Sequence, residues 1–158
     1  MSHPVSRLFD TALPVLAATQ RALTHLQAPA LLAARIFVGM AFFRSGLTKI
    51  ADWDTTLALF ADEYHVPFLP THVAAVAGTF GELFFPVLLI LGLMGRFSAL
   101  SLSVVNIVAV LSLEEIAPAA LQQHQFWGAL LVGVILWGPG KWSLDAWWWP
   151  KVVSNRLL

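Results

Sequence analysis

The chain has 158 residues, of which 58% are hydrophobic and 11% are charged, whereas about 25% of the residues in an ordinary soluble domain are charged. The composition therefore predicts an all-α membrane protein with a few spans and excludes a sizeable soluble module. The formal net charge of zero argues against a nucleic-acid partner, and the absence of cysteine excludes a protein dithiol, a thiolate-held iron–sulfur cluster and a cysteine nucleophile.

Residues 1–28 precede the first long apolar segment. They lack the basic start, apolar run and cleavage site of a signal peptide. Apolar residues recur at helical spacing through this region, at Leu8, Ala12, Leu16, Leu23 and Leu26. This spacing predicts an amphipathic helix that lies at the membrane interface. The alternative is an ordered tail with no membrane role.

Four segments are predicted to span a bilayer, since a span needs roughly 20 apolar residues. They are Ala30–Ile50, Val73–Met94, Phe97–Leu113 and Phe126–Trp137. The fourth is short and reaches full length only if residues 122–125 begin it in the headgroup layer. Gly95-Arg96 is a short connection between the second and third segments, which predicts an antiparallel hairpin. Residues 29–149 are therefore expected to form a four-helix antiparallel bundle, with residues 150–158 as a cytoplasmic tail.

The segments between the spans differ in charge. Residues 51–72 and 112–125 contain Asp and Glu but no Lys or Arg. The basic residues outside the spans fall on the other side: Arg7, Arg21, Arg96, Lys141, Lys151 and Arg156. Positive residues favour the cytoplasmic side. We therefore expect a multi-pass bacterial inner-membrane protein with both termini in the cytoplasm and both long loops outside.

Two further segments are predicted to lie against the membrane. Residues 55–64 have the pattern of a short amphipathic helix in the first outer loop, and Pro67 stops it. Near the C-terminus a group of tryptophans predicts an aromatic belt at the cytoplasmic interface. Its members are Trp142, Trp147, Trp148 and Trp149.

Glu82 is a carboxylate in the middle of the second apolar segment. An ionisable group near mid-membrane costs a few kcal/mol or more and implies a partner and a function. A rise of about 1.5 Å per residue places Arg44 roughly 9 Å, Asn106 roughly 10 Å and Glu82 roughly 13 Å from the outer ends of their helices. We predict that Arg44 pairs with Glu82, because a guanidinium can hold a carboxylate through two hydrogen bonds.

Other residues complete this predicted polar layer. Lys49 lies just above it, and His124 begins the fourth span at the same mouth. Phe42 and Trp127 are candidates to pack on a ligand ring. The alternative is that the charged pair only fixes helix register. Arg35 lies about three turns nearer the cytoplasm, where its long side chain is expected to reach lipid headgroups.

The histidines predicted on the outer side are weak candidates for a metal site. His65, His72 and His124 are predicted on the outer side with several carboxylates, and imidazole suits copper and zinc. No pair of histidines has the i, i+4 helical spacing of a metal site, so ordinary loop histidines are the better interpretation.

Three stretches resemble the DoxX family of bacterial membrane proteins. They are ARIFVGMAFFRSGLTKIADW from Ala34, GTFGELFFPVLLILGLMGR from Gly78, and WGPGKWSLDAW from Trp137. The resemblance covers about Ala30 to Trp149 and implies a four-helix inner-membrane protein. Relatives include small subunits of archaeal thiosulfate:quinone oxidoreductase, and some DoxX genes lie beside pathways that make metal-binding peptides.

These observations lead to one main functional hypothesis. The chain is expected to be the membrane subunit of a quinone-linked redox system, in which Arg44, Lys49 and Asn106 bind the quinone and Glu82 or His124 moves the proton. It would be part of a quinone-dependent oxidoreductase only with a partner protein, because it has no redox centre of its own.

Two alternatives stay open. The chain could be a non-enzymatic transport, export or metal-homeostasis factor for a metal, a small ligand or a peptide. It could also be a purely structural assembly subunit. Its expected partners are the lipid bilayer and either a redox or pathway protein or further copies of the chain in a homo-oligomer.

Overall fold

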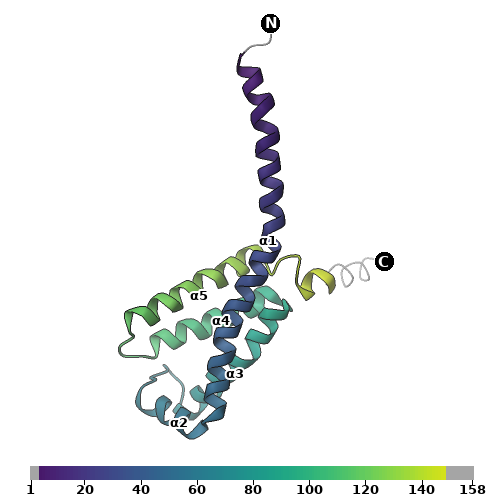
Figure 1. Cartoon of the computed structure of the whole chain (residues 1–158). Helices are drawn as coiled ribbons and strands as arrows, with labels where there is room; N and C mark the ends of the chain where they lie inside the picture. Colours follow the sequence, from purple (N-terminus) through teal and green to yellow (C-terminus); the bar gives the residue numbers. More distant parts are fainter. Residues whose placement is uncertain (1–3, 149–158) are drawn as a thin grey trace.

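The computed structural model describes residues 4–148, with side chains from residue 12 onward. This part of the chain is helical and contains no β-strand, which confirms the all-α prediction for these residues. The helices are α1 (Pro4–Ala51), α2 (Trp53–Asp62), α3 (Thr71–Leu91), α4 (Gly95–Leu111) and α5 (Pro118–Trp137). Four of them pack together, and the short α2 lies at one end of the bundle (Figure 1).

Among the described residues, two helices are long and apolar enough to cross a membrane. They are Ala12–Ala51 within α1 and Thr71–Leu91, which is α3. The apolar helix α4 is shorter. The four-span arrangement therefore stays a prediction.

α1 is one continuous helix of 48 residues that runs through Pro14 and Pro29. It joins the expected interfacial segment to the expected first span without a break. Its N-terminal half extends away from the other helices (Figure 1), and the side chains of residues 12–27 are all exposed. An interfacial position for this half stays a prediction.

The ends of the helices are set by individual turn and capping residues rather than by the ends of the apolar segments. α3 stops at Leu91 because Gly92 adopts φ +66°, a left-handed conformation that closes the helix. The chain turns at residues 92–94 and not at Gly95-Arg96, because Gly95 already begins α4. α5 begins earlier than expected, at Pro118, which favours the first turn of a helix.

α2 begins at Trp53 rather than Thr55. Asp52 caps it, because a side-chain oxygen of Asp52 accepts a hydrogen bond from the backbone N–H of Thr55 at 3.0 Å. The helix ends at Asp62. α2 packs on α3 through a small apolar cluster around Phe60, and it also contacts α1.

The bundle core is formed by residues from each long helix. α1 packs mainly on α3, and α5 packs mainly on α4. The buried side chains are Val38, Phe42, Leu89, Ala99, Leu102, Leu131 and Val134. These contacts hold the helices that position the polar residues described below.

Arg35 lies at the end of the bundle away from α2 and is fully buried. Its Nη1 donates to the carbonyl oxygens of Leu89 and Ile90 at 3.4 and 3.3 Å, and its Nη2 donates to the carbonyl of Trp142. A cation is favourable there, because the C-terminal end of α3 carries partial negative charge. The prediction that Arg35 reaches lipid headgroups is wrong, since the guanidinium turns inward to these carbonyls.

Asp145 serves the neighbouring helix at the same end. Its carboxylate accepts hydrogen bonds from the backbone N–H groups of Met94 at 2.8 Å and Gly95 at 2.7 Å. Its own N–H donates to the carbonyl of Gly92 at 3.0 Å. Asp145 therefore caps α4 and ties the C-terminal segment to the α3–α4 turn.

The tryptophans of the expected aromatic belt lie just beyond this turn. Trp142, Trp147 and Trp148 are exposed, as a belt at a membrane interface requires. Trp149 and the expected tail of residues 150–158 lie outside the described residues.

Candidate functional site

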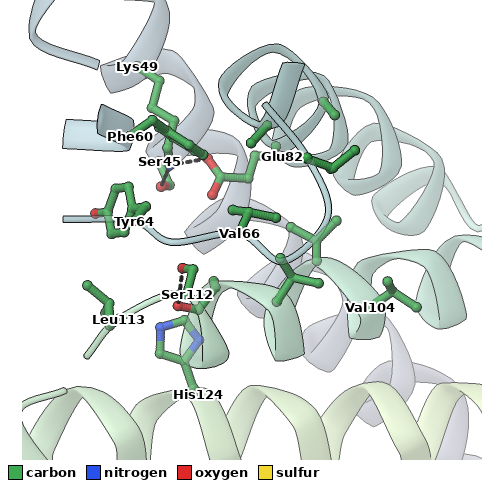
Figure 2. A pocket seen from close by; sticks show the side chains of 17 residues that line it. Ser45, Lys49, Phe60, Tyr64, Val66, Glu82, Val104, Ser112, Leu113 and His124 are labelled. Carbon is green, nitrogen blue, oxygen red and sulfur yellow. Dashed lines mark hydrogen bonds and ion pairs between the residues drawn. The ribbon is translucent and has the colours of Figure 1, made fainter. Parts of the chain in front are cut away.

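A cavity of about 310 Å³ lies at the end of the bundle that holds α2. We call it the central cavity. Its polar lining residues are Ser45, Lys49, Tyr64, Glu82, Ser112 and His124. Figure 2 shows them around one space, with the apolar side chain of Val66 between Glu82 and Ser112 and that of Val104 to one side. Its volume is at the lower limit of small-ligand pockets, which begin at roughly 300 Å³.

Lys49 and Glu82 form an ion pair on one wall of the central cavity. The Nζ of Lys49 lies 2.6 Å from Oε2 of Glu82 and donates a second hydrogen bond to Oγ of Ser45 at 3.0 Å. The two side chains are 18% and 9% exposed, so the pair is largely shielded from solvent. The prediction that Glu82 has a cationic partner on α1 is correct.

A glycine allows α1 and α3 to approach beside this pair. A Cβ on Gly46 would lie 2.8 Å from Cγ of Leu83 and 3.2 Å from Cβ of Glu82. A larger residue at position 46 would therefore push apart the two helices that carry the ion pair.

The identity of the partner was predicted wrongly. Arg44 is exposed, and the ion pair of Glu82 is with Lys49. Each helical residue turns the side chain by about 100°, so position 44 points about 140° away from position 49. Ser45 lies one turn before Lys49 and shares its face. The prediction compared only how deep each residue lies along its helix. The partner of Glu82 is decided by the direction in which each side chain points around α1.

His124 and Asn106 form a second polar unit. Nδ1 of His124 lies 2.7 Å from Oδ1 of Asn106, and Nδ2 of Asn106 donates to the backbone carbonyl of His124 at 3.0 Å. His124 lines the central cavity, whereas Asn106 lies behind it and is buried. The two predicted residues are thus brought together, with Asn106 acting on His124 rather than on Glu82.

The aromatic residues near the cavity differ from those expected. Phe42 and Trp127 contact each other with ring centroids 5.2 Å apart, and neither lines the central cavity. Trp127 also contacts the ring of His124 at 5.0 Å, so it supports His124 from the core. The aromatic wall is formed by Phe60 and Tyr64, whose ring centroids are 5.0 Å apart.

The loop after α2 closes over the cavity. Tyr64 and Leu113 form a β-bridge, and the N–H of His65 donates to the carbonyl of Ser112 at 2.8 Å. Burial raises the pKa of the Tyr64 phenol, and the nearby carboxylates of Glu63 and Glu82 raise it further. Tyr64 therefore keeps its hydroxyl proton at neutral pH and can donate a hydrogen bond. Sequence reasoning missed Tyr64, although it is the only tyrosine in the chain.

A second cavity of about 400 Å³ adjoins the first at the junction of α1 and α2. We call it the elbow cavity. It shares Ser45, Lys49, Phe60 and Tyr64 with the central cavity, and it adds Asp52. Hydrogen bonds from the backbone N–H and then from the hydroxyl of Thr55 lower the pKa of Asp52. The elbow cavity therefore presents an ionised carboxylate at neutral pH.

The three histidines considered for metal binding are not assembled into one site. The ring of His72 contacts Trp53 at 6.4 Å, and His124 is bonded to Asn106. Within the described part of the chain, no three His, Cys, Asp or Glu residues are grouped so that they could hold a metal ion.

Comparison with known proteins identifies the family. Residues 30–115 match the DoxX family. The chain belongs to the DoxX family. It is also 34% identical over 124 residues to an uncharacterized protein of Haemophilus influenzae, an alignment that covers 73% of this chain and 80% of that protein. No solved structure gives a significant match.

DoxX membership makes this chain a membrane protein, in agreement with its apolar helices. The matched DoxX segment includes Lys49, Tyr64 and Glu82, and it ends before His124. The ion-pair wall of the central cavity therefore lies within the family segment, and the His124 wall lies outside it.

Proposed function

We propose that this DoxX protein binds the head group of a membrane quinone in its central cavity and acts as the membrane subunit of a quinone-linked redox system. The observation that carries the proposal is the combination of apolar and aromatic walls with an ion pair and an imidazole in one cavity. Ligand pockets typically combine apolar walls with a few placed polar groups.

The side chains have distinct proposed roles. Lys49 has three N–H groups, of which two are used by Ser45 and Glu82, so the third can donate to a ring oxygen. Glu82 and His124 can accept and pass on protons, and Phe60 and Tyr64 can pack on the ring. Asn106 orients His124.

Three residues that the sequence predicted to bind the ligand are not part of the proposed site. Arg44 leaves the proposed ligand set because it is exposed on another face of α1. Phe42 and Trp127 leave the proposed ring wall because they belong to the core.

A bound quinone would supply the two-electron redox chemistry. The chain has no cysteine for a dithiol or a thiolate-held cluster, so we propose that a partner protein delivers the electrons. Four spans, with the α2 end outside and both termini in the cytoplasm, are part of the proposal. The acidic loops at the α2 end and the basic residues at the other end support this orientation.

The test is purification of the full chain with native lipid, followed by quinone extraction and quantification. We expect near-stoichiometric quinone with the natural chain and at least a fivefold loss in Lys49→Gln and Glu82→Gln, since a lost hydrogen bond to a charged group costs about 1.5–3 kcal/mol. Arg44→Gln is the matched control, because it removes a cation from the same helix outside the cavity. Absence of quinone from the natural protein, or equal loss in all three variants, contradicts the proposal.

One observation favours the alternative of a transport or export factor. The central and elbow cavities meet at Lys49, as a path for a small ligand would require. Growth of strains with and without the gene separates the two functions. A defect that follows copper, zinc or peptide supply, but not respiratory substrate, supports transport, and the reverse pattern supports the quinone role.

A further inference from the structure

The hydrogen bonds around Asn106 determine which nitrogen of His124 carries a proton. The backbone carbonyl of His124 can only accept a hydrogen bond, so the amide NH₂ of Asn106 must face it, at 3.0 Å. The amide oxygen of Asn106 is then the atom that lies 2.7 Å from Nδ1 of His124. An amide oxygen also only accepts, and Nδ1 must therefore be the donor.

A neutral imidazole with its proton on Nδ1 has a free lone pair on Nε2. Within the described part of the chain, Nδ1 is the nitrogen of this ring that has a side-chain partner. Figure 2 shows the ring of His124 rising from α5 toward Ser112 and Leu113 at the edge of the central cavity. His124 consequently offers the cavity a hydrogen-bond acceptor.

Glu82 offers a second acceptor. Its Oε2 is used by Lys49, whereas Oε1 has no hydrogen-bond partner among the described residues. An ionised carboxylate only accepts hydrogen bonds. The cavity thus has two acceptors on different walls, one from α3 and one from α5, that a ligand with two hydrogen-bond donors can satisfy.

We infer that the central cavity selects the reduced, hydroquinone form of its ligand, and that Asn106 is the positioning residue for this selection. This inference rests on the proposed function. A hydroquinone has two O–H donors, one for Nε2 of His124 and one for Oε1 of Glu82, and its oxygens can still accept from Lys49. The oxidised ring has two carbonyl acceptors and no donor, and so leaves both protein acceptors unpaired.

The two redox forms can be compared directly in the full chain. The protein is placed in phosphatidylcholine nanodiscs, and duroquinone and durohydroquinone are titrated by calorimetry under nitrogen, with empty nanodiscs as the blank. We expect durohydroquinone to bind at least tenfold more tightly, because its two O–H groups make hydrogen bonds that the oxidised form cannot make. Tenfold tighter binding of the reduced form raises the two-electron potential of the bound couple by about 30 mV.

Two variants of Asn106 test its positioning role. Asn106→Leu removes the acceptor that holds the proton on Nδ1, so the preference for durohydroquinone should fall by about threefold or more, as expected when one of the two hydrogen bonds is lost. Asn106→Asp keeps an acceptor at that position and should keep the preference. A residue that only packs would not change the ratio of the two dissociation constants. If the Leu variant does not fold, loss of the preference in Asn106→Asp contradicts the role of an acceptor at this position.

The outcomes separate this inference from the proposed function. Equal binding of the two forms, or tighter binding of duroquinone, overturns the selection of the reduced form and leaves the quinone site standing. A selectivity that survives in Asn106→Leu overturns the role of Asn106. If neither form binds, both the proposed function and this inference fail.

Discussion

Lys49 and Glu82 form an ion pair between α1 and α3 that the bundle largely shields from solvent. Removing an ion pair from water costs free energy that the attraction between the charges only partly repays. A gain in stability therefore does not by itself explain why the chain has this ion pair. Its position between two cavities, with a free N–H on Lys49 and a free oxygen on Glu82, is what suggests a ligand.

Removing one charge should be much worse than removing both. Lys49→Met leaves a 9%-exposed carboxylate without its partner, and we expect a loss of about 3–5 kcal/mol in the free energy of unfolding. The double variant Lys49→Met, Glu82→Leu should recover to within about 1 kcal/mol of the natural chain. Thermal unfolding in detergent, followed by circular dichroism, measures both changes.

The same double variant separates structure from ligand binding. It should be stable but lose its bound quinone. A stable double variant that keeps its quinone, or keeps its biological function, would show that the pair only holds the helices together.

The site residues show what the sequence could predict at this scale. The depth of a residue follows from a constant rise per residue. His124, expected at the mouth of the predicted layer, does lie against Asn106 of that layer. The prediction that Arg44 pairs with Glu82 was wrong because the depth of a residue does not determine the direction of its side chain around the helix. Phe60 and Tyr64 could not be assigned, since their place in the cavity depends on how α2 and its loop fold back onto α3 and α4.

At the scale of elements, the α3–α4 turn is held at both of its ends by hydrogen bonds from side chains. Arg35 binds the last carbonyls of α3, and Asp145 caps the first N–H groups of α4. Both ends of the turn are thus held by side chains from distant parts of the chain. The helix dipoles favour this arrangement, because the cation is at a C-terminal end and the anion at an N-terminal end.

Gly92 is the residue in this turn that tolerates least change. A Cβ there would lie 2.1 Å from Nη1 of Arg35 and 2.4 Å from Cβ of Ser143, at a φ of +66°. Gly92→Ala should therefore lower the unfolding free energy by at least about 2 kcal/mol, from left-handed strain of about 1–2 kcal/mol and the clash. The matched control is Gly133→Ala in α5, where the nearest atom is 3.6 Å away. Alanine should stabilise that helix by about 0.5–1 kcal/mol.

Thermal unfolding of the two alanine variants in the same detergent tests this contrast. Equal melting temperatures would mean that the turn relaxes around a side chain at position 92.

The elements themselves could largely be predicted from apolar length, but their ends could not. The end of α3 depends on the conformation of Gly92, and the cap of α4 comes from Asp145, far along the chain. Arg35 was misjudged for the same reason. A long cationic side chain in a span extends toward lipid headgroups unless buried carbonyl oxygens can accept its hydrogen bonds. The carbonyls of α3 and Trp142 come close to Arg35 only through tertiary packing, which the sequence does not show.

At the scale of the whole molecule, α1 sets a geometric limit. A helix of 48 residues is roughly 72 Å long, whereas the hydrocarbon core of a bilayer is about 30 Å thick. About half of α1 must therefore lie beyond the hydrocarbon. The half that leaves the bundle is the N-terminal half, which carries Arg21, and the half that packs on α3 carries the cavity residues.

The charge distribution predicts which end of the bundle lies outside. Loops at the α2 end carry Asp and Glu without Lys or Arg, and Arg96 and Lys141 lie at the opposite end. If all four long helices cross the membrane, His65 and Glu114 lie on the outer side and Arg96 and Lys141 on the inner side. The chain contains no cysteine, so single cysteines can report on each position without background.

Labelling of single-cysteine variants in intact spheroplasts with a membrane-impermeant maleimide tests this topology. His65→Cys and Glu114→Cys should react fully, whereas Arg96→Cys and Lys141→Cys should react only after detergent is added. Leu100→Cys, exposed on α4 outside the two cavities and surrounded by lipid in this arrangement, is the control that should stay unreactive in both states. The decisive pair is Arg96 and Glu114, because Arg96 lies in the first turn of α4 and Glu114 lies just beyond its last residue. The 17 residues of α4 span about 25 Å, so the helix must tilt little if it crosses. Reaction of both Arg96→Cys and Glu114→Cys in intact spheroplasts would mean that α4 does not cross the membrane. Reaction of Arg96→Cys alone would mean that the orientation is inverted and that the central cavity does not open to the outer side.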